Sequence, residues 1–418
     1  MTKSNGIHKA EDNFGVDLVT SEKNKKGIKM NIKKVINGTG VIIHSDFGRV
    51  PIAKKILKDL ANILDGYVNL EIDYLTGLKK DRIKLVEEEL LALTGAESAL
   101  VVNNNAASVL LILNTFAKGK EVIISRDQLI EVDDFFRIPD VIDSSEAKMV
   151  EVGATNNTIL SDYENAINEN TGLILLVYAN SYKNVGFSSS VKVESLLELG
   201  RKNNIPVAYN LGTGTMFELE WVDNVEPKVQ DCLLRGFELL CFSGDKLFGG
   251  PQAGIIIGKK EYINRMKKNP LYRALRCDKL CLGVLEGTLH LMKNGSSDTL
   301  PIEELVKTPV KKLKNRARRI LKGIDKKVLE DFLFKIIDSF SDISNISLSR
   351  LPSAAIYIHS EKYSAQIIEK WMRSNEPPIL GFIYKDIYFF DMRTIFDEDV
   401  KDIVKRINQF SELSMGSE

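Results

Sequence analysis

One lysine, Lys246, lies at a position in the sequence where it could take part in catalysis. In the stretch FSGDKLFGG, residues 242–250, Lys246 follows the apolar run LLCFS and precedes two glycines. Open α/β sheets bind their ligands at the carboxyl edge of the strands. At that edge, a lysine whose pKa is lowered by its surroundings can form a Schiff base with a carbonyl cofactor. From position alone, an ordinary surface lysine in a strand-to-helix loop is the commoner case.

A run of three asparagines adds a possible phosphate site. In VVNNNAASVLL, residues 101–111, a β-like run ends in Asn103, Asn104 and Asn105, and a helix rich in small residues begins. The backbone N–H groups at the start of such a helix can hold a phosphate, assisted by the amides. Asn-rich turns are also common helix caps, so this feature is weak by itself.

A glycine-rich turn and a pair of arginines follow the lysine and could also contact a ligand. GGPQAG, residues 249–254, lets the backbone approach a ligand closely. Arg273 and Arg276 in RALR are three apart, which on one helix face makes a fork for an oxyanion or phosphate. A solvated helix face is the usual alternative for such a pair. Together, the asparagine turn, the strand-end lysine and the glycine-rich turn indicate pyridoxal 5'-phosphate (PLP) as the cofactor.

The elements that must position these residues are predicted to alternate between strands and helices. The predicted strands are SALVV (98–102), EVIIS (121–125), KMVEVG (148–153), LILLVY (173–178), VAYN (207–210), LLCFS (239–243) and AGIIIG (253–258). Several are apolar without alternation, as expected of strands that are buried on both faces. Strands separated by helices need crossovers, which predicts a mainly parallel, doubly wound α/β sheet.

The same pattern predicts how the chain is divided. At 418 residues it exceeds the usual size of a single core, which favours one large domain and a smaller one. We predict a flexible, lysine-rich lead-in over residues 1–34 and a large PLP-binding domain over residues 35–300. Residues 301–418 are predicted to form a small α+β domain.

Composition limits the classes of function. Lys plus Arg and Asp plus Glu both number 57, so the formal net charge is zero and no global charge indicates nucleic-acid binding. The sequence has no run of about 18 apolar residues and no signal-peptide core, so we expect a cytoplasmic protein without membrane contact. The four cysteines lie in apolar or helical contexts without CxxC spacing, which favours structural thiols over a metal site or a disulfide framework.

Over residues 35–410 the chain resembles the bacterial selenocysteine synthases, the L-seryl-tRNA(Sec) selenium transferases. The similar blocks stand in the family's order and are INGTGVIIHSDFGR, VVNNNAASVLL, FRIPDVI, VEVGATNNT, FSGDKLFGGPQAGIIIG, NPLYRALRCDKL, LPSAA and FFDMRT. The resemblance implies a fold-type-I PLP enzyme that converts seryl-tRNA(Sec) to selenocysteinyl-tRNA(Sec) through an aminoacrylyl intermediate. It also implies selenophosphate or a similar anion as the donor, and a homodimer or larger ring of dimers.

The resemblance further implies roles for particular residues. Lys246 would form the Schiff base with PLP, flanked by Asp245. Ser243 and the turn formed by Asn103, Asn104 and Asn105 would lie near the cofactor phosphate. The residues that match family arginines in the anion-binding part of the site are Arg49, Arg82, Arg273 and Arg276.

Two departures from the family concern the tRNA and the cofactor ring. Family enzymes carry an N-terminal tRNA-binding domain, whereas 34 residues precede the VINGTG block here, so we expect this domain to be absent. The family also has an aspartate, in a DLGSG-like turn, that keeps the pyridine nitrogen of PLP protonated. This chain has YNLGTG, with Asn210 at that cofactor-binding position. A neutral amide cannot offset the charge of a protonated ring, so a weaker electron sink is expected.

Three functions therefore stay open from the sequence. The first is an active selenocysteine synthase, with tRNA held by another surface or by a partner. The second is a tRNA-independent PLP lyase or transferase that acts on a small amino acid. The third is a noncatalytic paralogue that assembles with a true synthase.

Overall fold

The computed structural model describes residues 30–133, 136–178, 191–218, 227–294, 300–345 and 349–415. Residues Val35–Glu418 form one compact unit, and the described residues 30–34 lie outside it. Most of the predicted lead-in, residues 1–29, lies outside the described residues, and its flexibility stays a prediction. None of the helices in the described ranges is long and apolar enough to cross a membrane.

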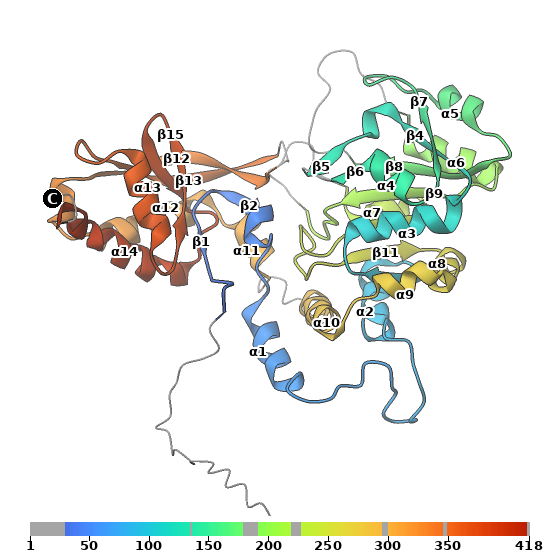
Figure 1. Cartoon of the computed structure of the whole chain (residues 1–418), viewed down its shortest axis with the longest axis horizontal. Coiled ribbons are helices and arrows are strands. Elements are labelled where there is room, and N and C mark those ends of the chain that lie inside the picture. Colours follow the sequence, from blue (N-terminus) through green and yellow to red (C-terminus); the bar gives the residue numbers. More distant parts are fainter. Residues whose placement is uncertain are drawn as a thin grey trace, which may run out of the picture. The chain divides into compact units, whose positions relative to one another are not determined.

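A seven-stranded sheet organises residues 98–258 (Figure 1). Its strands are β3 (Ser98–Val102), β4 (Glu121–Ser125), β7 (Lys148–Val152), β8 (Thr171–Val177), β9 (Val207–Gly212), β10 (Leu239–Ser243) and β11 (Gly254–Gly258). They lie in the order β3-β11-β10-β9-β8-β4-β7. All neighbours pair in parallel except β11, which is antiparallel to both β3 and β10. The seven predicted strands and the mainly parallel α/β sheet are confirmed.

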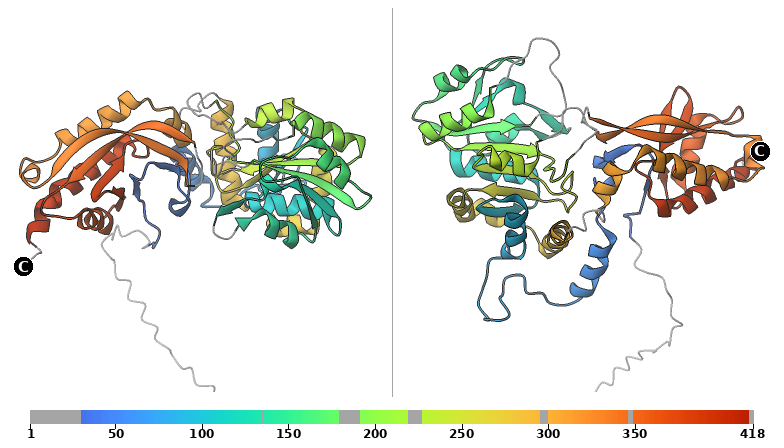
Figure 2. Two further views of the ribbon diagram at one scale, coloured as in Figure 1. Left: turned by 90° about the horizontal axis from the view of Figure 1, so that it is seen from above. Right: turned by 180° about the vertical axis from the view of Figure 1, so that it is seen from behind.

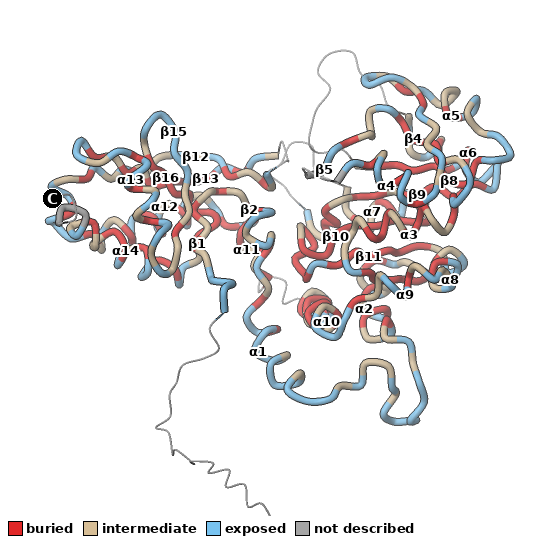
Figure 3. The backbone as a smooth tube through the Cα atoms, in the orientation of Figure 1, coloured by how far each residue is buried: buried red, intermediate tan, exposed pale blue. Residues whose placement is uncertain are grey.

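Helices cover both faces of this sheet, as its unbroken apolar strands require. One face packs against α2 (Lys84–Thr94), α5 (Leu160–Ala166), α6 (Val193–Lys202), α7 (Val229–Leu234) and α10 (Lys279–Lys293). The other packs against α3 (Asn105–Ala117), α4 (Ile138–Ser144), α8 (Lys260–Lys268) and α9 (Pro270–Leu275). Along β3, Ala99 and Val101 belong to the first core and Leu100 and Val102 to the second. Figure 3 shows the resulting buried centre in red.

A five-stranded sheet forms most of the C-terminal region. Its order is β15-β16-β13-β12-β2, and its strands are β2 (Val41–Ile43), β12 (Leu333–Ser344), β13 (Arg350–His359), β15 (Phe382–Tyr384) and β16 (Ile387–Asp391). The long pair β12 and β13 is drawn in orange in both views of Figure 2. The helices α12 (Val310–Lys322), α13 (Ala365–Ser374) and α14 (Val400–Asn408) share a core with this sheet.

The N-terminal strands pair with this C-terminal region. β2 runs parallel to β12, and β1 (Ile36–Asn37) runs parallel to β14 (Ile379–Leu380). The predicted domain boundary at residue 300 stays a prediction, but any such division leaves residues 36–43 hydrogen-bonded to the C-terminal strands. The remaining elements are α1 (Lys54–Ile63), α11 (Pro301–Lys307), β5 (Glu131–Asp133) and β6 (Phe136–Arg137).

Candidate active site

The carboxyl ends of neighbouring strands bring most of the predicted residues to one edge of the seven-stranded sheet. Ser243, the last residue of β10, pairs with Gly254, which in turn pairs with Val102, the last residue of β3. On the other side of β10, Phe242 pairs with Gly212 at the end of β9. Because β3, β9 and β10 run in the same direction, the segments that follow them meet at this edge.

The turn that carries Lys246 is held by backbone hydrogen bonds. The N–H of Gly244 donates to the carbonyl of Ala253 at 2.8 Å, and the N–H of Gly250 donates to the carbonyl of Gly244 at 2.7 Å. The N–H of Gly249 donates to the carbonyl of Lys246 itself at 3.0 Å. Lys246 is half-buried. The lysine is therefore presented from a fixed turn and not from a freely exposed loop.

Asp245, next to this lysine, is tied to a distant part of the chain. Its carboxylate Oδ2 accepts a hydrogen bond from Arg49 Nη1 at 2.6 Å. Asp245 is only 6% exposed, so its end of the ion pair is buried, while the Arg49 side chain is 26% exposed. Arg49 follows β2, has a left-handed backbone with φ 63°, and donates its N–H to the carbonyl of His44 at 2.8 Å. The pair thus joins the lysine turn to the segment after β2.

The asparagine turn combines a helix cap with a contact across the site. Asn104 is the N-cap of α3, and its Oδ1 accepts from the N–H of Ala107 at 2.8 Å. Asn105 Nδ2 donates to Asn210 Oδ1 at 2.8 Å. The N–H of Asn103 donates to the carbonyl of Leu275 at 2.9 Å, and Asn103 is exposed. The capping alternative is correct for Asn104, while Asn105 points toward the end of β9.

Asn210 is buried at this edge, and its amide has a defined orientation. Its Oδ1 accepts from Asn105 Nδ2 and from the backbone N–H of Gly212, the latter at 3.1 Å. A backbone N–H can only donate, so the oxygen of Asn210 must be the atom that faces Gly212. The NH2 group is then the part of Asn210 that remains to donate to a ligand.

Arg82 and Arg276 converge on one carboxylate, Glu71, which the sequence analysis did not single out. Glu71 Oε1 accepts from Arg82 Nε at 2.9 Å, from Arg82 Nη2 at 2.6 Å and from Arg276 Nη1 at 3.2 Å. The hydrogen bond from Arg82 lowers the pKa of Glu71. Arg276 forms an isolated bridge with Val102, which places this group beside the asparagine turn.

The expected fork of Arg273 and Arg276 on one helix face does not form. α9 ends at Leu275, and Arg276 has extended backbone with φ −64° and ψ 140°. Arg276 instead forms a β-bridge with Val102 and does not continue the helix. This pairing at the sheet edge supplies hydrogen-bond partners for backbone groups that the end of the helix leaves unpaired. Arg273 is exposed on α9. Arg276 instead shares Glu71 with Arg82. The four predicted arginines thus have three different surroundings, since Arg49 binds Asp245 and Arg273 is exposed.

Buried polar atoms without partners gather at the same edge. Within the described residues, the buried atoms at this edge that make no hydrogen bond are Asn105 Oδ1, Ser108 Oγ, Thr213 Oγ1, Asp245 Oδ1 and Arg276 Nε. A buried polar atom left unpaired destabilises a fold by about 1–3 kcal/mol, so such a cluster indicates that a polar ligand completes it. The Ser108 and Thr213 hydroxyls and the Arg276 N–H can donate to the phosphate and phenolic oxygens of PLP, and the two free oxygens can accept from a protonated ring nitrogen or a substrate amine. The residues present therefore fit the cofactor.

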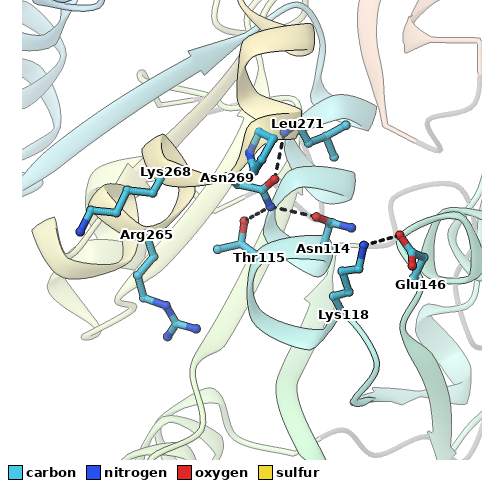
Figure 4. A pocket seen from close by; sticks show the side chains of 9 residues that line it. Asn114, Thr115, Lys118, Glu146, Arg265, Lys268, Asn269 and Leu271 are labelled. Carbon is cyan, nitrogen blue, oxygen red and sulfur yellow. Dashed lines mark hydrogen bonds and ion pairs between the residues drawn. The ribbon is translucent and has the colours of Figure 1, made fainter.

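Other features of the fold are weaker candidates for the site. The four cysteines are free, and burial raises the pKa of Cys232 to about 12, which keeps that thiol protonated at neutral pH. A surface pocket of about 610 Å³ lies at the C-terminal end of α3, with α8 and α9 beside it (Figure 4). There, Asn269 Nδ2 donates to Asn114 Oδ1 at 2.9 Å and to Thr115 Oγ1 at 3.0 Å. This pocket contains none of the predicted site residues, and these polar groups satisfy one another.

Gly254 at the start of β11 leaves the room that the asparagine turn needs. A Cβ at this position would lie 2.1 Å from the carbonyl oxygen of Asn104 and 2.2 Å from Ser108 Oγ. We expect Gly254→Ala to lower the free energy of unfolding by about 1–3 kcal/mol and to weaken PLP binding. Urea unfolding and PLP titration measure the two effects. The control is Gly66→Ala, since a Cβ at Gly66 meets nothing within 4 Å; equal behaviour of both variants would contradict the steric argument.

Comparison with known proteins first defines the class. The solved structure of D-glucosaminate-6-phosphate ammonia-lyase resembles this fold with a TM-score of 0.63 at 18% identity, covering 92% of this chain and 97% of that one. The fold is that of the fold-type-I PLP-dependent enzymes.

The sequence then defines the family. The L-seryl-tRNA selenium transferase family profile matches residues 35–396. The L-seryl-tRNA(Sec) selenium transferase of Clostridium botulinum strain Okra is 41% identical over 402 residues, covering 95% of this chain and 86% of that protein. The protein of the same name from Aquifex aeolicus is 43% identical over 389 residues, covering 92% and 86%. The chain belongs to this family and is a PLP-dependent transferase, which disfavours the noncatalytic alternative.

Proposed function

We propose that this protein converts seryl-tRNA(Sec) to selenocysteinyl-tRNA(Sec), with a phosphorylated selenium compound as donor. Its relatives bear the name of that activity. The observation that carries the proposal is the group of unpaired buried polar atoms around the lysine turn and the asparagine turn. When bound, PLP supplies an electron sink for the negative charge left at a substrate carbon that loses a proton.

Lys246 is proposed to hold the cofactor and to move the proton. Its amine lies on a turn that backbone hydrogen bonds fix, which suits a group that must return to one position in each turnover. When it is not bound to the cofactor, the Lys246 amine would act as the base for the proton on the α-carbon of the seryl group. Asp245 holds the turn in place through its ion pair with Arg49.

The asparagine turn and Ser243 are proposed to bind the cofactor phosphate. α3 begins at Asn105, so its first N–H groups and the positive end of its dipole lie at this edge. Ser243 is buried at the end of β10, and β11 separates it from Val102 at the end of β3. Asn210 is proposed to face the ring nitrogen with its NH2 group.

The arginines are proposed to hold the anionic donor. Arg82 and Arg276 present several N–H groups toward one point beside the asparagine turn, the arrangement that recognises phosphate or carboxylate. Arg273, exposed on the neighbouring helix, is proposed as a rim contact. The expectations of a homodimer or ring of dimers, and of a cytoplasmic location, stay predictions.

The direct test uses serylated tRNA(Sec) and selenophosphate. The PLP-loaded protein should convert the seryl group to selenocysteinyl, detected by mass spectrometry of the aminoacyl ester after its release from the tRNA. A gel shift at moderate salt tests tRNA binding separately, because a nonspecific electrostatic contact weakens steeply as salt rises. Absence of both tRNA binding and conversion would contradict the proposal.

Asn210 favours a second candidate function, a tRNA-independent lyase or transferase that acts on a small amino acid. A neutral amide at the position proposed for the ring nitrogen departs from the aspartate that the family resemblance implies, and the partner of the ring nitrogen tunes how well the ring accepts electrons. Release of pyruvate and ammonia from free L-serine, without tRNA, would support this candidate. Conversion that needs tRNA would reject it.

Asn210→Asp tests the weakened electron sink. An aspartate keeps the oxygen that accepts from Asn105 and Gly212, and replaces the NH2 group by a second oxygen that favours a protonated ring. We expect turnover to rise or stay level, as measured with the substrate that the preceding assays identify. A loss of more than about tenfold would show that the enzyme needs a neutral partner at this position.

A further inference from the structure

Glu71, Arg82 and Arg276 form a charged group in which the chain's own carboxylate lies where an anion would bind. Two N–H groups of Arg82 and one of Arg276 donate to the single oxygen Oε1 of Glu71. The side chains are 33%, 17% and 25% exposed, respectively, so the group lies at the boundary between protein and solvent. Two guanidinium charges thus share one carboxylate, and a buried N–H of Arg276, at Nε, makes no hydrogen bond within the described residues.

The two arginines are anchored to the sheet and its helices. Arg82 donates a third N–H, from Nη1, to the carbonyl of Cys277 at 2.8 Å. Arg276 is joined to the end of β3 by its bridge with Val102. Cys277 and Val102 are both buried, so the arginines extend from parts of the core that do not move easily.

Glu71, in contrast, lies on an exposed hairpin, whose tip is ordered by hydrogen bonds within the hairpin itself, such as those of Asp73. An isolated bridge between Ile72 and Lys79 closes the hairpin, and the N–H of Lys80 donates to the carbonyl of Glu71 at 3.0 Å. Tyr74 and Leu75 at its tip are 73% and 83% exposed. Of residues 71–80, which are all described, none is buried. A segment with so little buried surface opens at low cost in free energy.

We propose that Glu71 is an internal competitor for the anion site: its carboxylate occupies the arginine pair, and a substrate oxyanion binds only when the hairpin withdraws it. This inference rests on the proposed function and makes Glu71 a residue that sets affinity for the anionic donor. A competitor attached to the chain reduces apparent affinity by the fraction of molecules in which the site is open. It also prevents weak anions of the cell from occupying the arginines.

A structural role for Glu71 leads to the opposite result. If the carboxylate only holds the two arginines in position, its removal lets them separate and weakens anion binding. If it competes, its removal leaves both guanidiniums available and strengthens anion binding. The sign of the change therefore decides between the two roles.

The experiment measures binding of inorganic phosphate to the PLP-loaded protein by isothermal titration calorimetry. We expect Glu71→Gln to bind phosphate about tenfold more tightly than the unmodified chain, because the variant keeps the side-chain size but loses the charge. Glu71→Ala should show the same direction. Glu88→Gln is the matched control, since Glu88 is an exposed acid on the adjacent helix α2 and its removal makes the same change in net charge. This control should stay within about twofold of the unmodified chain.

A third comparison locates the phosphate. In Glu71→Gln combined with Arg276→Gln, the gain in phosphate affinity should disappear, because one arm of the arginine pair is gone. Unchanged or weaker phosphate binding in Glu71→Gln, or a gain that persists without Arg276, would overturn the inference. This titration contains no tRNA or amino acid, so its result is independent of the activity assay. If Glu71→Gln gains phosphate affinity but the unmodified chain does not convert seryl-tRNA, the inference is upheld and the proposed function is rejected.

Discussion

Replacing Lys246 by alanine is expected to abolish covalent attachment of the cofactor and to reduce turnover by at least about a thousandfold. The variant removes both the amine that would hold PLP and the proposed base for the α-proton. The turn itself should survive, since the backbone hydrogen bonds of Gly244, Gly249 and Gly250 and the ion pair of Asp245 with Arg49 all remain possible in the variant. The protein should therefore fold but lose the absorbance band of the lysine-bound cofactor.

Borohydride reduction followed by mass spectrometry gives the decisive measurement. In the unmodified chain the reduced cofactor should be found on the peptide that contains Lys246. The control is Lys260→Ala, in which an exposed lysine at the start of α8 is removed and the label on Lys246 should stay. A cofactor adduct on another peptide, or an unchanged absorbance band in Lys246→Ala, would show that this lysine has been wrongly assigned.

Replacing Arg49 by alanine is expected to lower the free energy of unfolding by about 3 kcal/mol. The change leaves Asp245 nearly buried at 6% exposure without its 2.6 Å partner, and an unpaired buried carboxylate is costly. The arginine side chain is 26% exposed, so some water can reach the carboxylate, which places the loss near the lower end of the usual range for a buried pair. Urea unfolding at neutral pH measures it.

A second substitution separates support of the turn from anion binding. Adding Asp245→Asn to Arg49→Ala removes the unpaired charge and should restore most of the lost stability. The surface pair Arg235–Glu194, with side chains 48% and 56% exposed, supplies the control, and Arg235→Ala should cost less than about 1 kcal/mol. If Arg49→Ala leaves unfolding unchanged and only raises KM, Arg49 contacts a substrate and does not support the turn.

The strands and the position of the lysine could be predicted because they depend on neighbouring residues. Runs such as LLCFS and AGIIIG are apolar throughout, and a strand buried on both faces requires this pattern. β10 and β11 accordingly span these runs. Lys246 follows the end of its strand by three residues, so its place at the sheet edge depends on local chain order alone.

The partners of the charged residues could not be predicted in the same way. Arg49 meets Asp245 across 196 positions of sequence, and Arg276 meets Glu71 across 205. Nothing in the local pattern around Glu71 distinguishes it from the other acids of an exposed, polar stretch. Helical spacing placed Arg273 and Arg276 together, but pairing with Val102 ended the helix one residue before Arg276.

The sequence by itself determined the α/β class, the seven strands of the main sheet, the family blocks and the lysine at the end of β10, because hydrophobic pattern and chain order are local properties. Only the tertiary structure decided which side chains meet at that lysine. It turned the oxygen of Asn210 toward Gly212, tied Asp245 to Arg49, and set Glu71 between Arg82 and Arg276. Those contacts depend on how strands far apart in the chain come to lie side by side, and side-chain hydrogen bonds form only after that packing has brought the partners within about 3 Å.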